Sequence, residues 1–402
     1  MMLVAPSPSR AVVAPSILVI LAPIMAVVLF GFLIIGLALP VLPLHVHQGL
    51  GLSTFVVGLI TGSQFAASLI SRLWSGHYAD SRGAKRAVVA GLLGAVAAGL
   101  LYIASLSFIG TPAISATILL LGRALLGGAE SFIITGALSW GLALVEARHT
   151  GKVIAWIGTA MYAAFALGAP MGSFLYATYG FLAIALATTL MPLATLLLVA
   201  LLRPVAPQHR GSPAFTKVIG AIWMPGIGLA FSSIGFGAIT AFISLLFVDR
   251  GWGPAWLAFS AFAASFMMVR IFFGHLPDRL GGAKVALVSV LIEATGQALI
   301  WLAPGATLAL IGAVLTGIGY SLVYPGLGIE AVHSAPPESR GLAMGAYTAF
   351  LDLALGITSP ILGLIASGIG LGAVFLASTV AVLGAAVVAV RLVKARPIHY
   401  QS

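Results

Sequence analysis

The sequence predicts an all-α integral membrane protein with twelve transmembrane helices, arranged as two similar six-helix bundles with both termini in the cytoplasm. Three observations lead to this prediction. Apolar residues make up 61% of the 402 residues and charged residues only 7%, whereas about 25% of the residues of an ordinary globular protein are charged. Apolar runs of about 18 residues or more, long enough to cross a bilayer, recur along the chain. A polar motif also occurs twice, about half a chain length apart.

The apolar runs form two sets of six, separated by short polar or glycine-containing segments. The first run carries no charge and is longer than the apolar core of a signal peptide, so we expect it to be retained. The runs are continuous rather than alternating, which favours helices over the strands of a membrane barrel. The expected helices span residues 17–44, 54–77, 86–108, 113–145, 151–176, 181–202, 218–248, 254–275, 283–302, 306–331, 341–367 and 371–393.

A single polar segment, residues 203–217, lies at the middle of the chain and is rich in proline and basic residues. It predicts a linker between an N-terminal bundle, residues 16–202, and a C-terminal bundle, residues 218–393. Short tails, residues 1–15 and 394–402, flank the two bundles.

The net charge of +10 is explained better by membrane topology than by nucleic-acid binding. With this helix count, nearly all Lys and Arg residues fall in alternate loops, as the positive-inside rule requires. Arg250 is the exception on the opposite side, and Arg123 lies within a helix. We therefore expect both termini and the linker on the cytoplasmic side of a bacterial inner membrane.

The residue pattern argues against several other functions. The chain has no cysteine, so it has no disulfide and no thiol chemistry. Most of its histidines lie at predicted helix ends without the spacing of metal ligands. It contains no phosphate-binding loop, no pair of catalytic carboxylates and no nucleophile elbow. We therefore expect no enzyme activity, no metal and no cofactor.

One polar motif occurs in residues 72–85 and again in residues 270–284. Arg, Gly, His, Asp and a second Gly recur in the same order and at the same spacing. Each copy interrupts apolar runs, so we expect a short loop between two spanning helices. The glycines allow turns and close backbone approach, and each Asp can face a helix N-terminus. The candidate residues of these loops are Gly76, Asp80, Gly83, Lys85, Gly274, Asp278, Gly281 and Lys284.

Residues 76–85 (GHYADSRGAK) resemble the motif between the second and third helices of the major facilitator superfamily. The second copy resembles the weaker repeat of that motif between helices eight and nine. This chain has Ser81 where the motif has Arg, and Ala84 where it has a basic residue. The resemblance implies two parallel six-helix bundles, usually in a monomer, that hold a substrate between them near the middle of the membrane.

The same resemblance implies a gate at the cytoplasmic side. Asp80 would face the start of a helix near Arg340, and Asp278 would face the start of another near Arg148. An Asp beside a helix N-terminus contributes about 0.3–1 kcal/mol. These contacts would hold one conformation and break as the two bundles move.

Two further segments resemble the drug:proton antiporter branch of the superfamily. Residues 123–127 are similar to its helix 4 motif, in which the Arg is implicated in proton transfer, with Leu126 where that motif has Gln. The predicted helix of residues 151–176 carries a degenerate form of the helix 5 motif of the efflux branch. Small residues there allow close helix approach. The residues of this second motif are Gly158, Gly168, Pro170 and Gly172.

Charged residues inside predicted membrane helices are functional candidates, because burying such a charge costs at least about 2.5–3.5 kcal/mol. Arg123 and Glu130 share one helix face, roughly 10 Å apart. We expect them to interact and Glu130 to load and unload a proton; the alternative is a static ion pair. Asp352 is a second protonatable or cation-binding group, or else it fixes the seam between the bundles by hydrogen bonding. Glu293 is interpreted as a neutral structural carboxyl.

By resemblance to the family, helices 1, 4, 7 and 10 would line the substrate cavity. Aromatic side chains with a few polar groups suit an amphipathic small molecule. The candidate lining residues are Phe32, Gln64, Ser131, Phe236, Tyr320 and Tyr324.

These features predict a secondary transporter that exports a small organic molecule, such as a drug, a sugar or a metabolite, in exchange for protons. Its expected partners are that substrate, protons and the lipid bilayer. Two alternatives remain open. One is a proton-coupled uptake symporter, and the other is a sensor or scaffold that has a transporter fold but no flux.

Overall fold

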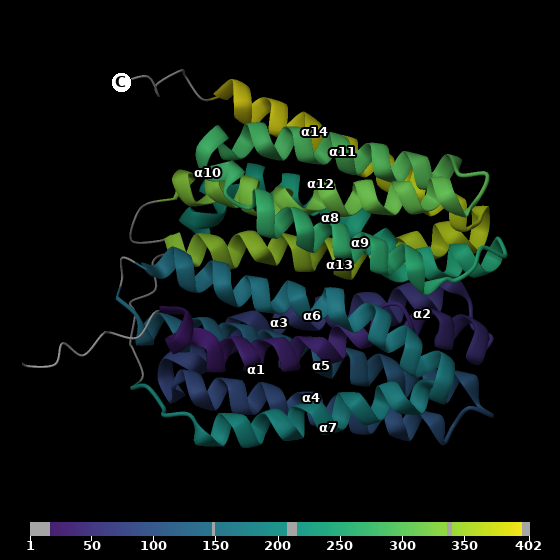
Figure 1. Cartoon of the computed structure of the whole chain (residues 1–402), viewed down its shortest axis with the longest axis horizontal. Helices are drawn as coiled ribbons and strands as arrows, with labels where there is room; N and C mark the ends of the chain where they lie inside the picture. The colour runs from purple at the N-terminus through teal and green to yellow at the C-terminus, as the bar shows by residue number, and fades with distance from the viewer. Residues whose placement is uncertain (1–16, 147–148, 207–214, 336–339, 396–402) are drawn as a thin grey trace, which may run out of the picture.

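The computed structural model of the chain describes residues 17–146, 149–206, 215–335 and 340–395. Within these ranges every regular element is a helix, and twelve helical segments are long and apolar enough to cross a membrane. The predicted fold class is confirmed, and Figure 1 shows the two helical bundles one above the other.

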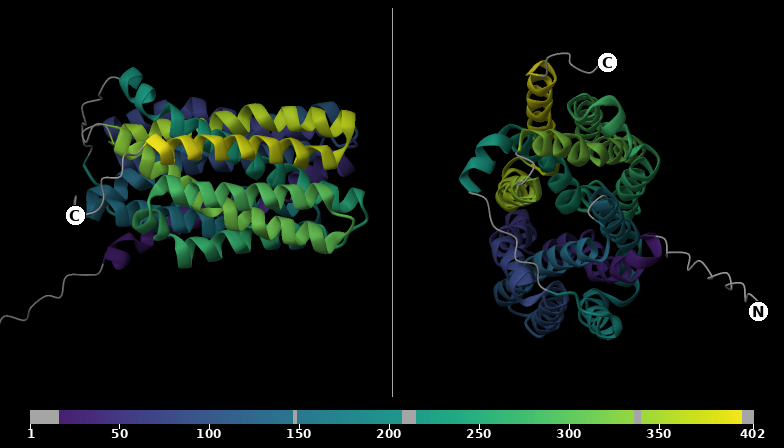
Figure 2. Two further views of the ribbon diagram at one scale, coloured as in Figure 1. Left: turned by 90° about the horizontal axis from the view of Figure 1, so that it is seen from above. Right: turned by 90° about the vertical axis from the view of Figure 1, so that its left-hand side faces the viewer.

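The helices of the N-terminal half are α1 (Ile17–Ala38), α2 (Leu42–Leu44), the π-helical turn η1 (His45–Gly49), α3 (Thr54–Arg82), α4 (Ala84–Leu106), α5 (Pro112–Leu144), α6 (Thr150–Tyr179) and α7 (Phe181–Leu201). Those of the C-terminal half are α8 (Phe215–Asp249), α9 (Trp256–Phe273), α10 (Leu276–Leu280), α11 (Gly282–Leu302), α12 (Ala306–Ser334), α13 (Arg340–Ile369) and α14 (Leu371–Ala395). Figure 2 shows the same two bundles from above and from one end.

The two halves contact each other chiefly along two seams, α3 with α13 and α6 with α9. We call the end of the molecule that carries the two repeated motifs the motif end, and the opposite end the far end. In Figure 1 the motif end is on the left, where α10 lies.

The first repeated motif is helical, which corrects the expected loop. Helix α3 continues through the motif to Arg82, and the chain turns only at Gly83, whose φ is 98°. In the second copy α9 ends at Phe273, α10 forms a short helix, and Gly281 has a φ of 94°. The polar residues of the motif do not break a helix, whereas glycine adopts this φ without steric cost. The two glycines therefore mark the turns.

Glycine residues bring α6 into backbone contact with α1. A Cβ atom at Gly168 would lie 2.6 Å from the α1 backbone, and one at Gly172 would collide with it. A Cβ atom at Gly158 or Gly76 would have no neighbour within 4 Å. The close approach expected from small residues thus occurs at Gly168 and Gly172 but not at Gly158 or Gly76.

This difference predicts opposite effects of alanine at two positions of α6. Gly172→Ala should lower the stability by about 1–3 kcal/mol, because the added methyl group overpacks the α1 contact. Gly158→Ala should leave it unchanged or raise it by up to about 1 kcal/mol, since Ala is the better helix former. Thermal unfolding of the purified protein in detergent measures both. Equal melting temperatures for the two variants would contradict the close contact.

At the far end, α3 and α13 hold the halves together. Thr54 Oγ1 donates a hydrogen bond to the Gly363 carbonyl (3.0 Å) and lies 2.8 Å from Ser367 Oγ. A Cβ atom at Gly58 would collide with the carbonyl of Ser359, so the two helices meet backbone to backbone. This packing closes the seam at the far end.

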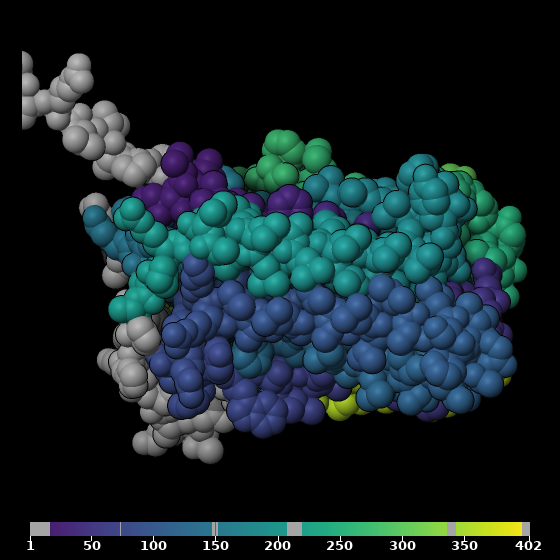
Figure 3. Space-filling view, turned by 90° about the horizontal axis from the view of Figure 1, so that it is seen from below, coloured from purple at the N-terminus to yellow at the C-terminus, as the bar shows by residue number. Residues whose placement is uncertain are grey.

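The outer faces of the helices are apolar and suited to lipid. Figure 3 shows the N-terminal half from below, where α7 in teal and α4 and α5 in blue form a continuous surface. Leu197 and Leu201 of α7 are 73% and 82% exposed. Apolar surface of this extent is stabilised by lipid chains rather than water.

Candidate functional site

An ion pair joins the two halves across the α3–α13 seam. Arg72 on α3 donates to Oδ2 of Asp352 on α13 from Nε (2.9 Å) and from Nη2. Ser68, one turn from Arg72, donates to the same oxygen at 3.4 Å. The side chains of Arg72 and Asp352 are 21% and 4% exposed. Because both charges are largely withdrawn from solvent, removing one would leave the other unpaired at a high cost.

Glu130 on α5 lies close to this ion pair. Its sequence neighbour Ser131 is 3.0 Å from Ser68, which itself contacts Asp352. Oε2 of Glu130 accepts a hydrogen bond from Gln64 Nε2 at 2.7 Å. Among the described residues no cation lies within ion-pair distance of Glu130. Glu130 is half-buried. Its other carboxyl oxygen, Oε1, is not fully enclosed by the protein, so it remains accessible.

The expected contact between Arg123 and Glu130 is not formed. Arg123 is fully buried, and its Nε and Nη1 have no hydrogen-bond partner. The Thr61 hydroxyl and Oε1 of Gln64, both on α3, also lack partners. Helices α3 and α5 touch where a Cβ atom at Gly127 would collide with the backbone of Gln64. Gln64 on the adjacent helix is therefore a nearer donor for Glu130 than Arg123, which lies two turns away on the same helix.

A chain of aromatic rings crosses between the halves at the other seam. Neighbouring ring centroids in it lie 4.6–6.2 Å apart. The contact across the seam is between Tyr162 on α6 and Phe266 on α9, at 4.6 Å. This aromatic bridge consists of Phe32, Phe165, Tyr162, Phe266, Tyr320 and Phe236. It brings three of the predicted lining residues, from α1, α8 and α12, into one connected group.

Arg270 on α9 lies at the same seam. Its guanidinium carbon is 5.2 Å from the centroid of the Tyr162 ring, and its Nη1 donates to the Ser321 carbonyl at 3.0 Å. Tyr324, one turn from Ser321 on α12, lies 2.8 Å from the Thr348 hydroxyl of α13. Thr348 is one turn from the carboxylate of the ion pair, so α12 and α13 connect the two seams.

The arginine that opens each copy of the repeated motif was not predicted to have a functional contact. Arg72 and Arg270 were attributed to the positive-inside charge bias. Each of them instead reaches the opposite half, Arg72 at Asp352 and Arg270 at Tyr162. The sequence did contain a sign of these contacts, because arginine occupies the same position in both copies of the motif. A positive charge bias in the loops does not require an arginine at one fixed position.

Lys85 of the first motif makes its contacts within one half. Its Nζ donates to the carbonyls of Ala200 (3.1 Å) and Leu202 (2.6 Å) at the end of α7. A cation at a helix C-terminus binds carbonyls that have no partner in the helix. These bonds hold α4 to α7 and do not join the two halves.

The other charged side chains of the expected gate make no hydrogen bond or ion pair in the described part of the chain. Asp80 is half-buried, and Asp278 and Lys284 are exposed. The partner expected for Asp278, Arg148, lies outside the described residues. The partner expected for Asp80, Arg340, begins α13, but its side chain also lies outside them. The gate contacts stay a prediction.

Glu293 lies in a buried polar cluster inside the C-terminal half. Its Oε2 accepts a hydrogen bond from Ser232 at 2.5 Å, and Oε1 has no partner. Gln297, one turn along α11, donates to the Gly235 carbonyl (3.1 Å) and accepts from Ser378 (2.5 Å). In the described residues no cation pairs with Glu293. A buried carboxylate without a cation is costly, which favours a neutral carboxyl.

Substitution of Glu293 tests this interpretation. Glu293→Gln keeps a neutral side chain of the same shape and should leave the melting temperature in detergent nearly unchanged. Glu293→Ala should lower the stability by about 1–3 kcal/mol, because it leaves buried groups without partners. If glutamine destabilised the protein as much as alanine, the carboxyl would have to be charged.

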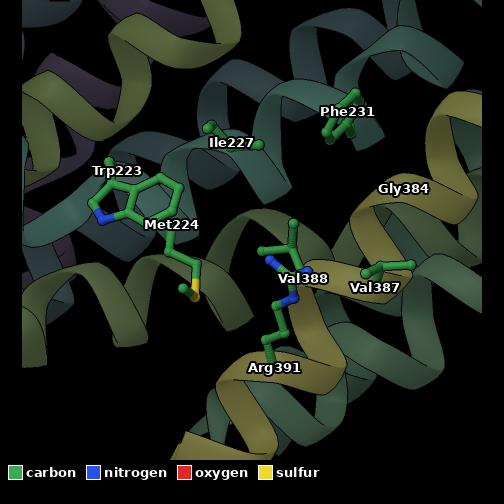
Figure 4. A pocket seen from close by; sticks show the side chains of 8 residues that line it. All are labelled: Trp223, Met224, Ile227, Phe231, Gly384, Val387, Val388 and Arg391. Carbon is green, nitrogen blue, oxygen red and sulfur yellow. The ribbon is translucent and has the colours of Figure 1, made fainter.

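A groove of about 340 Å³ lies between α8 and α14, on the outside of the C-terminal half (Figure 4). Figure 4 labels eight side chains that line it, four from each helix. None of the residues that line this groove belongs to either seam between the two halves. In the described residues there is also no group of three or more His, Asp or Glu residues placed to hold a metal ion.

Comparison with known proteins identifies similar chains. The family model described as Major Facilitator Superfamily matches residues 24–284 and 226–401. An uncharacterised MFS-type transporter of Salmonella typhimurium is 44% identical over 366 residues, which cover 91% of this chain and 94% of the relative. The uncharacterised MFS-type transporter YhhS of Escherichia coli K12 is 40% identical over 380 residues, 94% of each chain. The crystal structure of a D-xylose–proton symporter, only 14% identical, has a TM-score of 0.75 and covers 92% of this chain and 97% of its own, a likeness of fold.

Proposed function

Because the chain belongs to the Major Facilitator Superfamily, we propose that this membrane transporter exports a small organic molecule in exchange for protons. The proposal includes a place in a bacterial inner membrane, with the motif end in the cytoplasm. The concentration of Lys and Arg at that end supports this orientation through the positive-inside rule.

The observation that carries the proposal is the position of Glu130. This carboxyl group lies between the membrane-spanning helices, has an accessible oxygen and has no cation within ion-pair distance among the described residues. A half-buried carboxyl without a counter-ion can gain and lose a proton. Intramembrane carboxyl groups of this kind mark proton pathways in transporters.

The ion pair between Arg72 and Asp352 supports alternating access. It links the two halves and is strongest when the carboxyl is charged. Protonation of Asp352 would remove the attraction and allow α3 and α13 to separate. In the proposed cycle a proton from outside neutralises Glu130 or Asp352 and releases the substrate, and loss of the proton inside restores the affinity. Asp80 and Asp278 would form further contacts that break as the halves move.

Arg123 has a role in the proposed cycle because two of its donors, Nε and Nη1, have no partner. A charged Glu130 attracts the guanidinium, which lies about two helical turns away on the same helix. The hydrogen bond that Gln64 of α3 donates to Glu130 is also stronger when the carboxyl is charged. Loss of the proton would therefore strengthen the attraction of Glu130 for groups on both α3 and α5.

The aromatic bridge and the polar residues beside it would bind the substrate. Aromatic faces with a few polar groups suit an amphipathic molecule such as a drug, a sugar derivative or another metabolite. Export is favoured by the degenerate antiporter motif of α6, in which Gly168 and Gly172 set the packing against α1. One proton moving down a potential of about 100 mV supplies about 2.3 kcal/mol, enough for roughly a fiftyfold gradient.

Flux through the purified protein in liposomes tests the proposal. A thermal-shift screen with sugars, amino-acid derivatives and drug-like amines would first select a ligand. The radiolabelled ligand is then followed in proteoliposomes with and without an imposed pH gradient, and a trapped pH dye follows protons. We expect substrate and protons to move in opposite directions. Movement in the same direction would establish an uptake symporter, and binding without flux would establish a sensor.

A further inference from the structure

The groove between α8 and α14 has apolar walls and a single polar end. Trp223, Ile227 and Phe231 lie at four-residue intervals on α8, so they share one helix face. Gly384 and Val388 lie at the same interval on α14. A Cβ atom at Gly384 would lie 3.5 Å from the Phe231 ring. This is an ordinary van der Waals distance, so alanine would fit at this position, whereas a side chain as large as leucine would occupy the groove.

Arg391 lies at the end of the groove that faces the motif end. It is four residues from the end of α14, and Figure 4 shows its side chain extending into the groove beside Val388. In the described part of the chain Arg391 has no hydrogen bond and no ion pair. Lys394, about one turn further along the same helix, is also exposed. The end of the groove therefore carries an uncompensated positive charge.

The groove opens sideways, toward the surrounding bilayer. Trp223 and Val387 on its two edges are 48% and 55% exposed, and both helices are candidate membrane spans. Trp223 begins the groove at the motif end, the depth at which tryptophan side chains prefer to lie at a membrane interface. An occupant must combine an apolar chain with an anionic group at the interface. A second copy of this protein fits poorly, since each copy carries a net charge of +10.

We propose that this groove is a binding site for an anionic phospholipid. One acyl chain lies between α8 and α14 along Ile227 and Gly384, and the phosphate accepts hydrogen bonds from Arg391. Basic pockets between membrane helices bind the head groups of anionic lipids, which are enriched in the cytoplasmic leaflet. The lipid links α8, which also packs against α13, to the outermost helix of the half. The site is separate from the seams, so it does not depend on the proposed transport cycle.

Native mass spectrometry of the detergent-purified chain tests the site. The probes are dioleoylphosphatidylglycerol and dioleoylphosphatidylcholine, added at equal concentrations. We expect the wild type to retain the first lipid with about tenfold higher affinity than the second, a difference of about 1.4 kcal/mol. Arg391→Gln should abolish the preference for phosphatidylglycerol. Gly384→Leu should weaken binding of both lipids, because it fills the groove while keeping the charge.

Arg203→Gln is the matched control, because Arg203 is also an exposed basic residue at the motif end but lies beyond α7 in the other half. It should bind both lipids as the wild type does. Equal retention of the two lipids by the wild type would overturn the proposal. So would unchanged binding in both Arg391→Gln and Gly384→Leu, or a loss in Arg203→Gln as large as in Arg391→Gln. If Arg391→Gln fails to fold, the wild-type preference and the Gly384→Leu variant still decide.

Discussion

Asp352→Asn is expected to reduce substrate flux in proteoliposomes by about a hundredfold. The substitution leaves Arg72 without a counter-ion inside the α3–α13 seam. An unpaired charge of this kind costs about 3–5 kcal/mol, and we take the lower value because Arg72 keeps some exposure. A cost of about 3 kcal/mol lowers the equilibrium constant for forming the present arrangement by about a hundredfold. The cycle needs this arrangement, so flux falls with its population.

A double-mutant cycle separates this effect from simple loss of a side chain. Arg72→Gln combined with Asp352→Asn leaves two neutral groups, so it should recover most of the melting temperature that either single variant loses. Asp249→Asn is the matched control. Asp249 lies 4.0 Å from Arg250, and both side chains are more than half exposed, so this pair contributes little. Additive losses in the double variant would show that the ion pair does not couple the halves.

Glu130→Gln is expected to uncouple transport from protons. The amide cannot take up a proton, so the variant should remain in the state that neutral Glu130 has in the wild type. Accumulation of substrate inside proteoliposomes under a pH gradient should fall about tenfold or more. Exchange of labelled for unlabelled substrate at equal pH should persist only at a higher substrate concentration, because the neutral state binds the substrate more weakly. In the wild type, substrate binding should strengthen as pH rises, because loss of the proton restores affinity. In the variant, binding should not change with pH.

Glu293→Gln is the control for this experiment, since Glu293 is also a buried glutamate but lies away from both seams. It should keep the pH dependence of the wild type. If Glu130→Gln still drove substrate against a gradient when only a pH difference was applied, Glu130 would not be the proton carrier. If both variants lost the pH dependence, the effect would not be specific to the site between the halves.

The fold could be predicted from the sequence because every spanning helix is a long apolar run. The ends of the helices were less predictable. The first repeated motif is polar, and polarity indicates the membrane boundary rather than the end of a helix, so α3 continues to Arg82. The sequence also gave no way to separate Gly158 from Gly172. Both lie on a helix that is apolar around its circumference, so the face that meets α1 has no sequence signature.

The candidate site was predictable in its residue types and less so in its pairs. Glu130 and Asp352 stood out because charges are rare in membrane helices. Their partners did not, because Gln64 and Arg72 come from α3, and Arg72 is 280 residues from Asp352 in sequence. Only the packing of α3 against α5 and α13 brings these groups together. Arg123, the neighbour along the helix, is therefore not the group that contacts Glu130 directly.

The hydrogen bond between Thr54 and Ser367 has a practical consequence for following motion in this protein. The two hydroxyl oxygens are 2.8 Å apart and belong to opposite halves, and the chain has no cysteine of its own. A pair of cysteines placed at these positions would be close enough to form a disulfide, with no other thiol in the chain to compete. Comparing flux before and after reduction of that disulfide would show whether transport requires the far end of the seam to open.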